Sequence, residues 1–137
     1  MREVLFKAKR IDNGKWVEGC YLKRYDLLGN EEHLIFHADS YTVWEYAEID
    51  PETLCQFTGL YDKVGRRIWK NDIVGAWSQG SKAIGEVRQR IDGLWIMYPV
   101  WQNHEFWELK PNSNGETTVE VLGNAFDNPE LLQEDHK

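Results

Sequence analysis

Alternating apolar and polar side chains predict β-strands along most of this chain. The pattern starts at Val4, Phe6 and Ala8, which alternate with Leu5, Lys7 and Lys9. A period of two residues places successive side chains on opposite faces of a strand. Further runs, rich in β-branched and aromatic residues, lie at 16–22, 34–36, 40–49, 53–60, 67–69, 73–77, 83–91, 94–100, 104–109 and 117–122. The sequence shows no long segment with the 3.6-residue period of an amphipathic helix.

Turn signals separate these runs and predict antiparallel hairpins. Asn and Gly accept positive φ, so the segments 12–14, 62–65 and 92–93 predict hairpin turns. Asp50 followed by Pro51 predicts a turn or a single helical turn, because Asp caps and Pro fits the next position. Pro129 and the residues after it predict one short C-terminal helix.

Repeated short strands with turns between them predict a mainly β fold, either barrel-like or a sandwich. The 137 residues suit a single domain over residues 1–137. An alternative is a sub-domain division near residues 70–80, with an SH3-like barrel in the C-terminal half.

Four segments, in a fixed order, resemble the YopX family of bacteriophage and prophage proteins. They are residues 6–10 with 12–17 and Gly19; 50–54 with 56–60 and 62–63; 71–74; and 123–124 with 128–132. The resemblance implies a mainly β, phage-encoded protein. The family has no established activity, so the resemblance assigns no site residue.

Two residues depart from the family's usual pattern at turns. Val64 stands where Asn or Asp is expected before Gly65, and a β-branched residue resists positive φ. We therefore expect this turn to differ from the common two-residue type. Asn71 stands where Gly is frequent before Asp72, but Asn tolerates similar backbone angles.

Charge and cysteine content limit the function classes. The formal net charge is −7, and residues 71–137 carry 5 basic and 11 acidic side chains. This balance disfavours broad binding to a phosphate backbone. No apolar run is long enough to cross a bilayer, and the N-terminus lacks a signal-peptide pattern. We expect a protein in the bacterial cytoplasm that binds no membrane, with Cys20 and Cys55 reduced and buried.

Catalytic and metal-binding motifs are absent from the sequence. It holds no GxSxG, HExxH, P-loop or GxGxxG motif, and neither cysteine has the context of a known nucleophile. His33 and His37 are four residues apart, which in a strand separates them by about 13 Å, too far for one metal ion. We predict no catalytic residue, no cofactor and no metal site, and we favour a protein that is not an enzyme.

One segment is a candidate binding surface. Basic residues interleaved with aromatic residues are typical of nucleic-acid binding, although a solvated hairpin tip would give the same pattern. The candidate residues are Tyr61, Lys63, Arg66, Arg67, Trp69 and Lys70. The later tryptophans pack in a core or form exposed stacking platforms. They are Trp69, Trp77, Trp95, Trp101 and Trp107.

The function expected from the sequence is therefore interaction rather than catalysis. The first hypothesis is a protein-interaction module that self-associates and binds a host or phage protein. The alternative is a nucleic-acid-binding accessory factor that uses the basic and aromatic cluster at 61–70, which the net charge disfavours.

Overall fold

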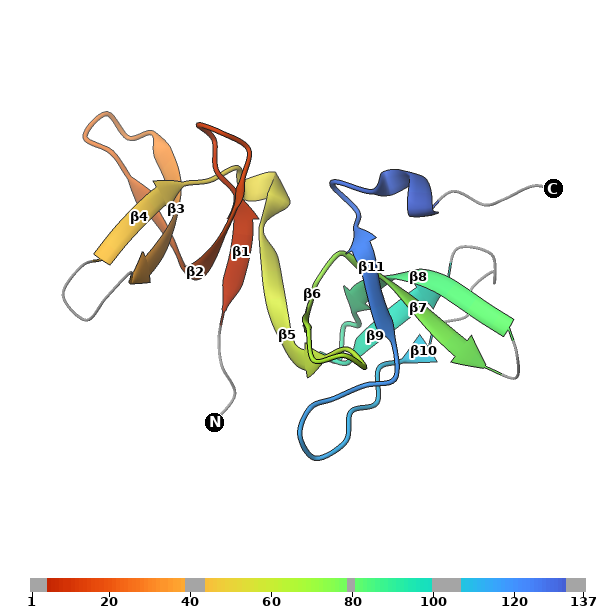
Figure 1. The fold of residues 1–137 in the computed structure, drawn as a ribbon. Helices are drawn as coiled ribbons and strands as arrows, with labels where there is room; N and C mark the ends of the chain where they lie inside the picture. The colour runs from red at the N-terminus through yellow and green to blue at the C-terminus, as the bar shows by residue number, and fades with distance from the viewer. Residues whose placement is uncertain (1–4, 39–43, 79–80, 100–106, 133–137) are drawn as a thin grey trace. The chain divides into compact units, whose positions relative to one another are not determined.

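The computed structural model describes residues 5–38, 44–78, 81–99 and 107–132, and these form a mainly β fold (Figure 1). Eleven strands form two antiparallel sheets, in the orders β4-β3-β2-β1-β5-β6 and β10-β9-β8-β7-β11. The predicted fold class is confirmed. Neither sheet closes into a barrel within the described residues, and the expected C-terminal helix is only the 3-10 turn η2 (Pro129–Leu132).

The chain divides into two compact units, Met1–Phe57 and Thr58–Lys137. Residues 70–80, where the sequence suggested a division, belong to the second unit. Strand β5 (Cys55–Tyr61) begins in unit 1 and continues into unit 2.

Unit 1 is a curled antiparallel sheet. Its strands are β1 (Phe6–Lys9), β2 (Trp16–Tyr25), β3 (Glu31–Ala38), β4 (Trp44–Glu48) and the start of β5. Two backbone hydrogen bonds join the end of β4 to the end of β1. The N–H of Ile11 donates to the carbonyl of Glu48, and the N–H of Asp50 donates to the carbonyl of Lys9. The curl encloses a small core.

The core of unit 1 occupies one face of the sheet. Ala8, Ile35 and Ile49 are buried there, and partly buried neighbours pack against them. Burying an isoleucine contributes about 2 kcal/mol. Odd-numbered residues of β2 face this core, so even-numbered residues such as Leu22 and Arg24 lie on the opposite face.

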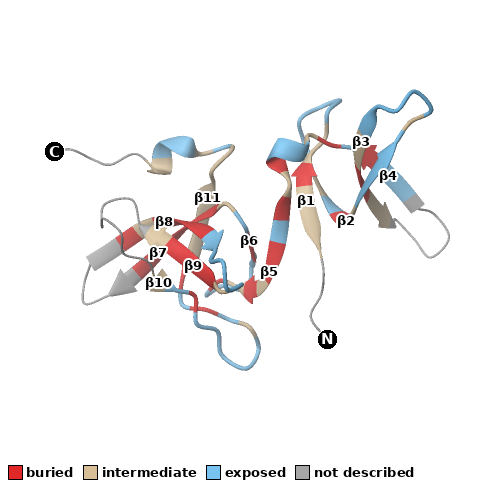
Figure 2. Ribbon diagram, turned by 180° about the vertical axis from the view of Figure 1, so that it is seen from behind, coloured by how far each residue is buried: buried red, intermediate tan, exposed pale blue. Residues whose placement is uncertain are grey.

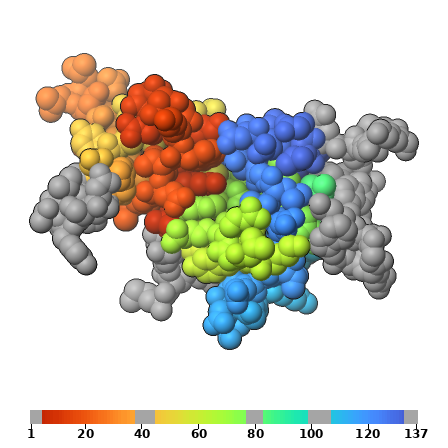
Figure 3. All heavy atoms as spheres, viewed as in Figure 1, coloured from red at the N-terminus to blue at the C-terminus, as the bar shows by residue number. Residues whose placement is uncertain are grey.

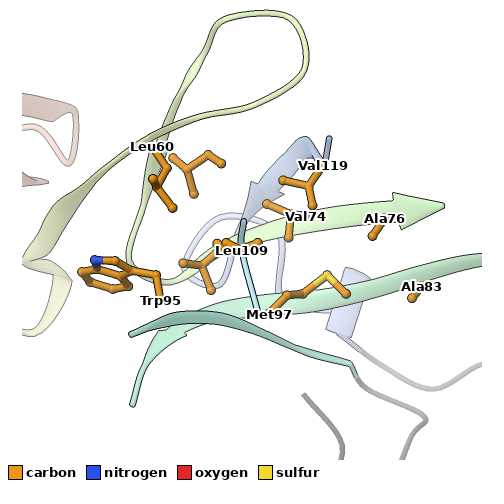
Figure 4. Close-up of a cluster of buried hydrophobic side chains, with 10 residues drawn as sticks. Leu60, Val74, Ala76, Ala83, Trp95, Met97, Leu109 and Val119 are labelled. Atoms are coloured by element: carbon orange, nitrogen blue, oxygen red, sulfur yellow. The ribbon is translucent and has the colours of Figure 1, made fainter. Parts of the chain in front are cut away.

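Unit 2 is sandwich-like, because a two-stranded ribbon packs over a five-stranded sheet. The ribbon joins the end of β5 to β6 (Arg67–Trp69). The sheet contains β7 (Asp72–Ser78), β8 (Ser81–Gln89), β9 (Trp95–Pro99), β10 (Trp107–Glu108) and β11 (Glu120–Asn124). Leu60 and Ile68 from the ribbon share one hydrophobic cluster with the sheet's Val74, Trp95 and Met97 (Figure 4).

Four hairpin turns share one geometry. In each, the first residue's N–H donates to the carbonyl of the fifth, and a glycine at the fourth position donates back to the first. The turns begin at Asp26, Asp62, Arg90 and Asn112. In the second turn Gly65 has φ +89°, while Val64 stays at negative φ. This confirms that the turn is not a two-residue type.

Asn71 is the only non-glycine residue with positive φ in the described part of the chain, at 72°. Its N–H donates to Val87, its carbonyl accepts from Ala125, and its Nδ2 donates to Glu86 at 3.1 Å. The expected tolerance of Asn at this position is confirmed.

Asn71→Val should destabilise the protein by about 2 kcal/mol, because a β-branched side chain resists positive φ. Asn71→Gly should lose less than about 1 kcal/mol, since glycine accepts this backbone and only a side-chain hydrogen bond is lost. Urea unfolding of both variants checks this, and equal stability of the two would contradict it.

The helical segments described are the turns η1 (Pro51–Thr53) and η2, both far too short to span a bilayer. Asp50 caps η1 by accepting from the N–H of Glu52, as its sequence predicts.

Candidate binding surfaces

The predicted basic and aromatic cluster lies on the β5–β6 hairpin of unit 2. Its four basic side chains are exposed: Lys63, Arg66, Arg67 and Lys70. Tyr61 is half-buried, and Trp69 is only 5% exposed. Trp69 therefore belongs to the buried part of unit 2, and its ring offers no stacking platform.

Other tryptophans also have assigned environments. Trp95 is buried in the cluster of Figure 4, and Trp107 packs against that cluster. In unit 1, Trp16 is half-buried beneath the ammonium groups of Lys7 and Lys9, at 4.7 and 5.5 Å from the ring centre. The side chain of Trp77 and all of Trp101 fall outside the described residues.

Asp62 fixes the tip of the β5–β6 hairpin. Its carboxylate is fully buried. One oxygen accepts from the backbone N–H groups of Val64 and Arg66; the other accepts from the Arg66 guanidinium and from the N–H of Val121. Burial alone would raise the pKa of Asp62. The N–H donors of Val121, Arg66 and Val64, with the Arg66 charge, outweigh burial and hold that pKa below its ordinary value.

The same hairpin lies beside the segment that precedes β11. The N–H of Tyr61 donates to Gly115, that of Thr117 donates to Tyr61, and that of Lys63 donates to Val119, each at 2.8 Å. Figure 3 shows the yellow-green hairpin and the blue segment exposed on one face of unit 2. This parallel contact joins residues more than fifty positions apart, which no local pattern could predict.

An open depression of about 650 Å³ forms where these segments meet. Its lining residues are Lys63, Lys110, Pro111, Asn112, Glu116, Thr117 and Thr118. Lys63 was a sequence candidate, whereas Lys110 was not, because it stands alone between Leu109 and Pro111. The structure thus places a second lysine beside Lys63 in the lining of this depression.

A different surface lies on the β2–β3 hairpin of unit 1. Leu27 and Leu28, at its tip, have relative exposures of 105% and 87% (Figure 2). Leu22 and Tyr46 are 44% and 58% exposed on the face opposite the core. We call Leu22, Leu27, Leu28 and Tyr46 the hairpin surface. Sequence reasoning missed it, since Leu27 and Leu28 lie between the predicted strands at 16–22 and 34–36.

The strand residues of the hairpin surface, Leu22 and Tyr46, have packed neighbours. The rings of Phe36 and Tyr46 lie 5.6 Å apart, and the Arg24 guanidinium lies 5.6 Å from the Tyr46 ring. Leu34 occupies the register position between Leu22 and Glu48 and is fully buried. The exposed side chains of Leu22 and Tyr46 therefore lie next to side chains that are themselves packed.

His33, on β3, has a hydrogen-bonding neighbour at each ring nitrogen. His33 contacts the Tyr21 hydroxyl at 2.6 Å through Nδ1 and Glu31 at 2.9 Å through Nε2. Lys23 pairs with the other oxygen of Glu31, which holds the pKa of Glu31 below its ordinary value. Within the described residues, no three His, Cys, Asp or Glu side chains converge as metal ligands would.

The two cysteines differ in environment. Cys55 is buried, and its Sγ–H donates to Thr53 at 3.3 Å. Cys20 is exposed. The expectation that both thiols are buried is therefore wrong for Cys20, which lies on the outer face of β2 with Leu22.

These features define a mainly β protein of two units that presents an apolar hairpin and a basic hairpin. The profile of the YopX protein family matches residues 5–133, so the chain belongs to this family. The crystal structure of protein EF1440 from Enterococcus faecalis is similar, with 20% identity and a TM-score of 0.48. That match covers 97% of this chain and 100% of the other. No curated protein gives a significant match.

Proposed function

We propose that this protein is a non-catalytic, phage-type interaction module that self-associates through the hairpin surface and acts in the cytoplasm of a bacterial host. The observation that carries the proposal is the exposure of Leu27 and Leu28, two adjacent leucines at one hairpin tip. Exposed apolar patches commonly mark sites of protein interaction. Burying two leucine side chains would contribute about 3–6 kcal/mol to association.

The charges of the hairpin support a second copy of the chain as its partner. Arg24 on β2 lies directly opposite Glu32 on β3, on the same face as Leu22 and Tyr46. Both signs of charge therefore flank one apolar surface. In a two-fold dimer, each contact from one copy to the other is repeated in the reverse direction. Arg24 of one copy can then face Glu32 of the other.

The double variant Leu27→Ser/Leu28→Ser should weaken self-association by at least about 100-fold, since two leucines per protomer are lost. The fold of the single chain should stay intact, because both side chains are exposed in it. Light scattering coupled to size-exclusion chromatography measures the mass of each variant.

Ile91→Ser provides the matched control. Ile91 is 107% exposed and occupies the tip of the β8–β9 hairpin, in a turn of the same geometry. This variant should associate as the wild type does. An oligomer that persists unchanged in the double leucine variant would exclude the hairpin surface as the interface.

A further inference from the structure

Several arginine and lysine side chains in the described residues are paired with a carboxylate. The pairs are Arg10–Asp12, Lys23–Glu31, Arg24–Glu32, Arg66–Asp62, Arg88–Glu86 and Arg90–Asp92. Lys63 and Lys110 form no such pair with any residue that the structure describes. Both line the depression of unit 2, so its lining carries two lysines against one carboxylate, that of Glu116.

The backbone on both sides of this depression is held in place. Lys63 follows the buried Asp62, and its own N–H donates to Val119. On the other side, Asn112 begins a tight turn, in which its side chain accepts from the N–H groups of Asn114 and Glu116. The two lysines therefore project from fixed backbone, which limits the entropy lost when a ligand binds.

Two of the other lining residues supply neutral hydrogen-bonding groups. Thr118 is exposed and carries a hydroxyl, and Asn112 carries an amide. Glu116 is the one carboxylate among the lining residues, and the Asn112 Nδ2 contacts it at 3.3 Å. Two ammonium groups beside a hydroxyl suit an oxyanion with more than one negative charge.

We propose that this depression binds a phosphate group through Lys63, Lys110 and Thr118. Its volume of about 650 Å³ admits a phosphate together with part of the molecule that carries it. The carrier is either a small phosphorylated molecule or a nucleic-acid strand. In the second case the exposed Arg67 and Lys70 on the same hairpin extend the contact.

Binding of two probes to the full-length chain tests the proposal. Inorganic phosphate is titrated by NMR at constant ionic strength, with chloride as the reference anion. A fluorescein-labelled single-stranded oligonucleotide is followed by anisotropy at low salt. Phosphate alone would identify a small phosphorylated ligand. Binding of the oligonucleotide as well, with an affinity that falls as salt rises, would identify a strand.

The double variant Lys63→Gln/Lys110→Gln should weaken the binding of either probe at least about tenfold, a loss of about 1.4 kcal/mol. Lys15→Gln is the matched control, because Lys15 is also exposed and forms no ion pair with the described residues. All three residues are at the surface, so melting temperatures should agree.

Failure of both probes to bind the wild-type chain would overturn the proposal, and so would equal binding by the double variant and the control. Neither result bears on self-association through Leu27 and Leu28, which lie in the other unit.

Discussion

A Gly19→Ala variant should lose about 3 kcal/mol of unfolding free energy, the upper range for overpacking a buried site. Gly19 is buried in β2, opposite Phe6 of β1. A Cβ atom there would overlap the backbone carbonyl of Phe36 and lie 3.0 Å from the Ile35 side chain. Backbone cannot rotate away as a side chain can, so β2 and β3 must separate. Urea unfolding followed by circular dichroism measures the loss.

Gly29→Ala is the control for this effect. Gly29 has φ +84°, and a Cβ there meets nothing within 4 Å. Only the strain of alanine at a positive φ then lowers the unfolding free energy, by about 1 kcal/mol. If Gly19→Ala lost no more unfolding free energy than Gly29→Ala, β3 would not approach Gly19 as closely as described.

An Asp62→Asn variant should lose about 3 kcal/mol through the buried hydrogen bonds of the β5–β6 turn. The amide oxygen can still accept from Val64 and Arg66. The amide nitrogen, however, would take the place of the oxygen that accepts from the N–H of Val121 and from the Arg66 guanidinium. Donor would then face donor in a buried site. Chemical unfolding followed by tryptophan fluorescence, to which the buried Trp95 of this unit contributes, measures the loss.

The pH dependence of stability gives an independent readout. The folded pKa of Asp62 is lowered, so its contribution is complete above the unfolded value of about 3.9 and is lost as pH falls through the folded pKa. The wild-type chain should therefore lose stability below about pH 4. The Asp62→Asn variant should lose less over that range, having no carboxylate there.

Asp26→Asn supplies the comparison, because Asp26 accepts from the same two turn positions but in solvent. Its effect on stability should be less than half that of Asp62→Asn. Similar losses from both variants would show that burial and the bond to Val121 add nothing at Asp62.

The hairpins could be predicted from sequence because their signals are local. Glycines with Asp or Asn nearby marked the turns at Gly14, Gly65 and Gly93, and each has positive φ in the structure. Asn71, a residue type that tolerates such backbone angles, also has positive φ. In each case the backbone conformation is decided by residues within a few positions.

The candidate surfaces could be predicted only in part, because they depend on contacts between distant segments. The basic residues at 63–70 were identified. Packing in a core was one of two environments considered for Trp69, since a three-residue strand does not reveal which face is covered. Lys110 reaches the depression through the pairing of Tyr61 with Thr117. The exposure of Leu27 and Leu28 depends on where the β2–β3 hairpin ends. The turn residues alone do not determine that position.

Sedimentation velocity of the wild-type chain, from about 1 to about 100 µM, tests self-association most directly. The account predicts a sedimentation coefficient that rises with concentration, toward a species of at least twice the 16.1 kDa chain mass. Two-fold association through the hairpin surface would stop at the dimer. A single 16.1 kDa species at every concentration would contradict the proposed function.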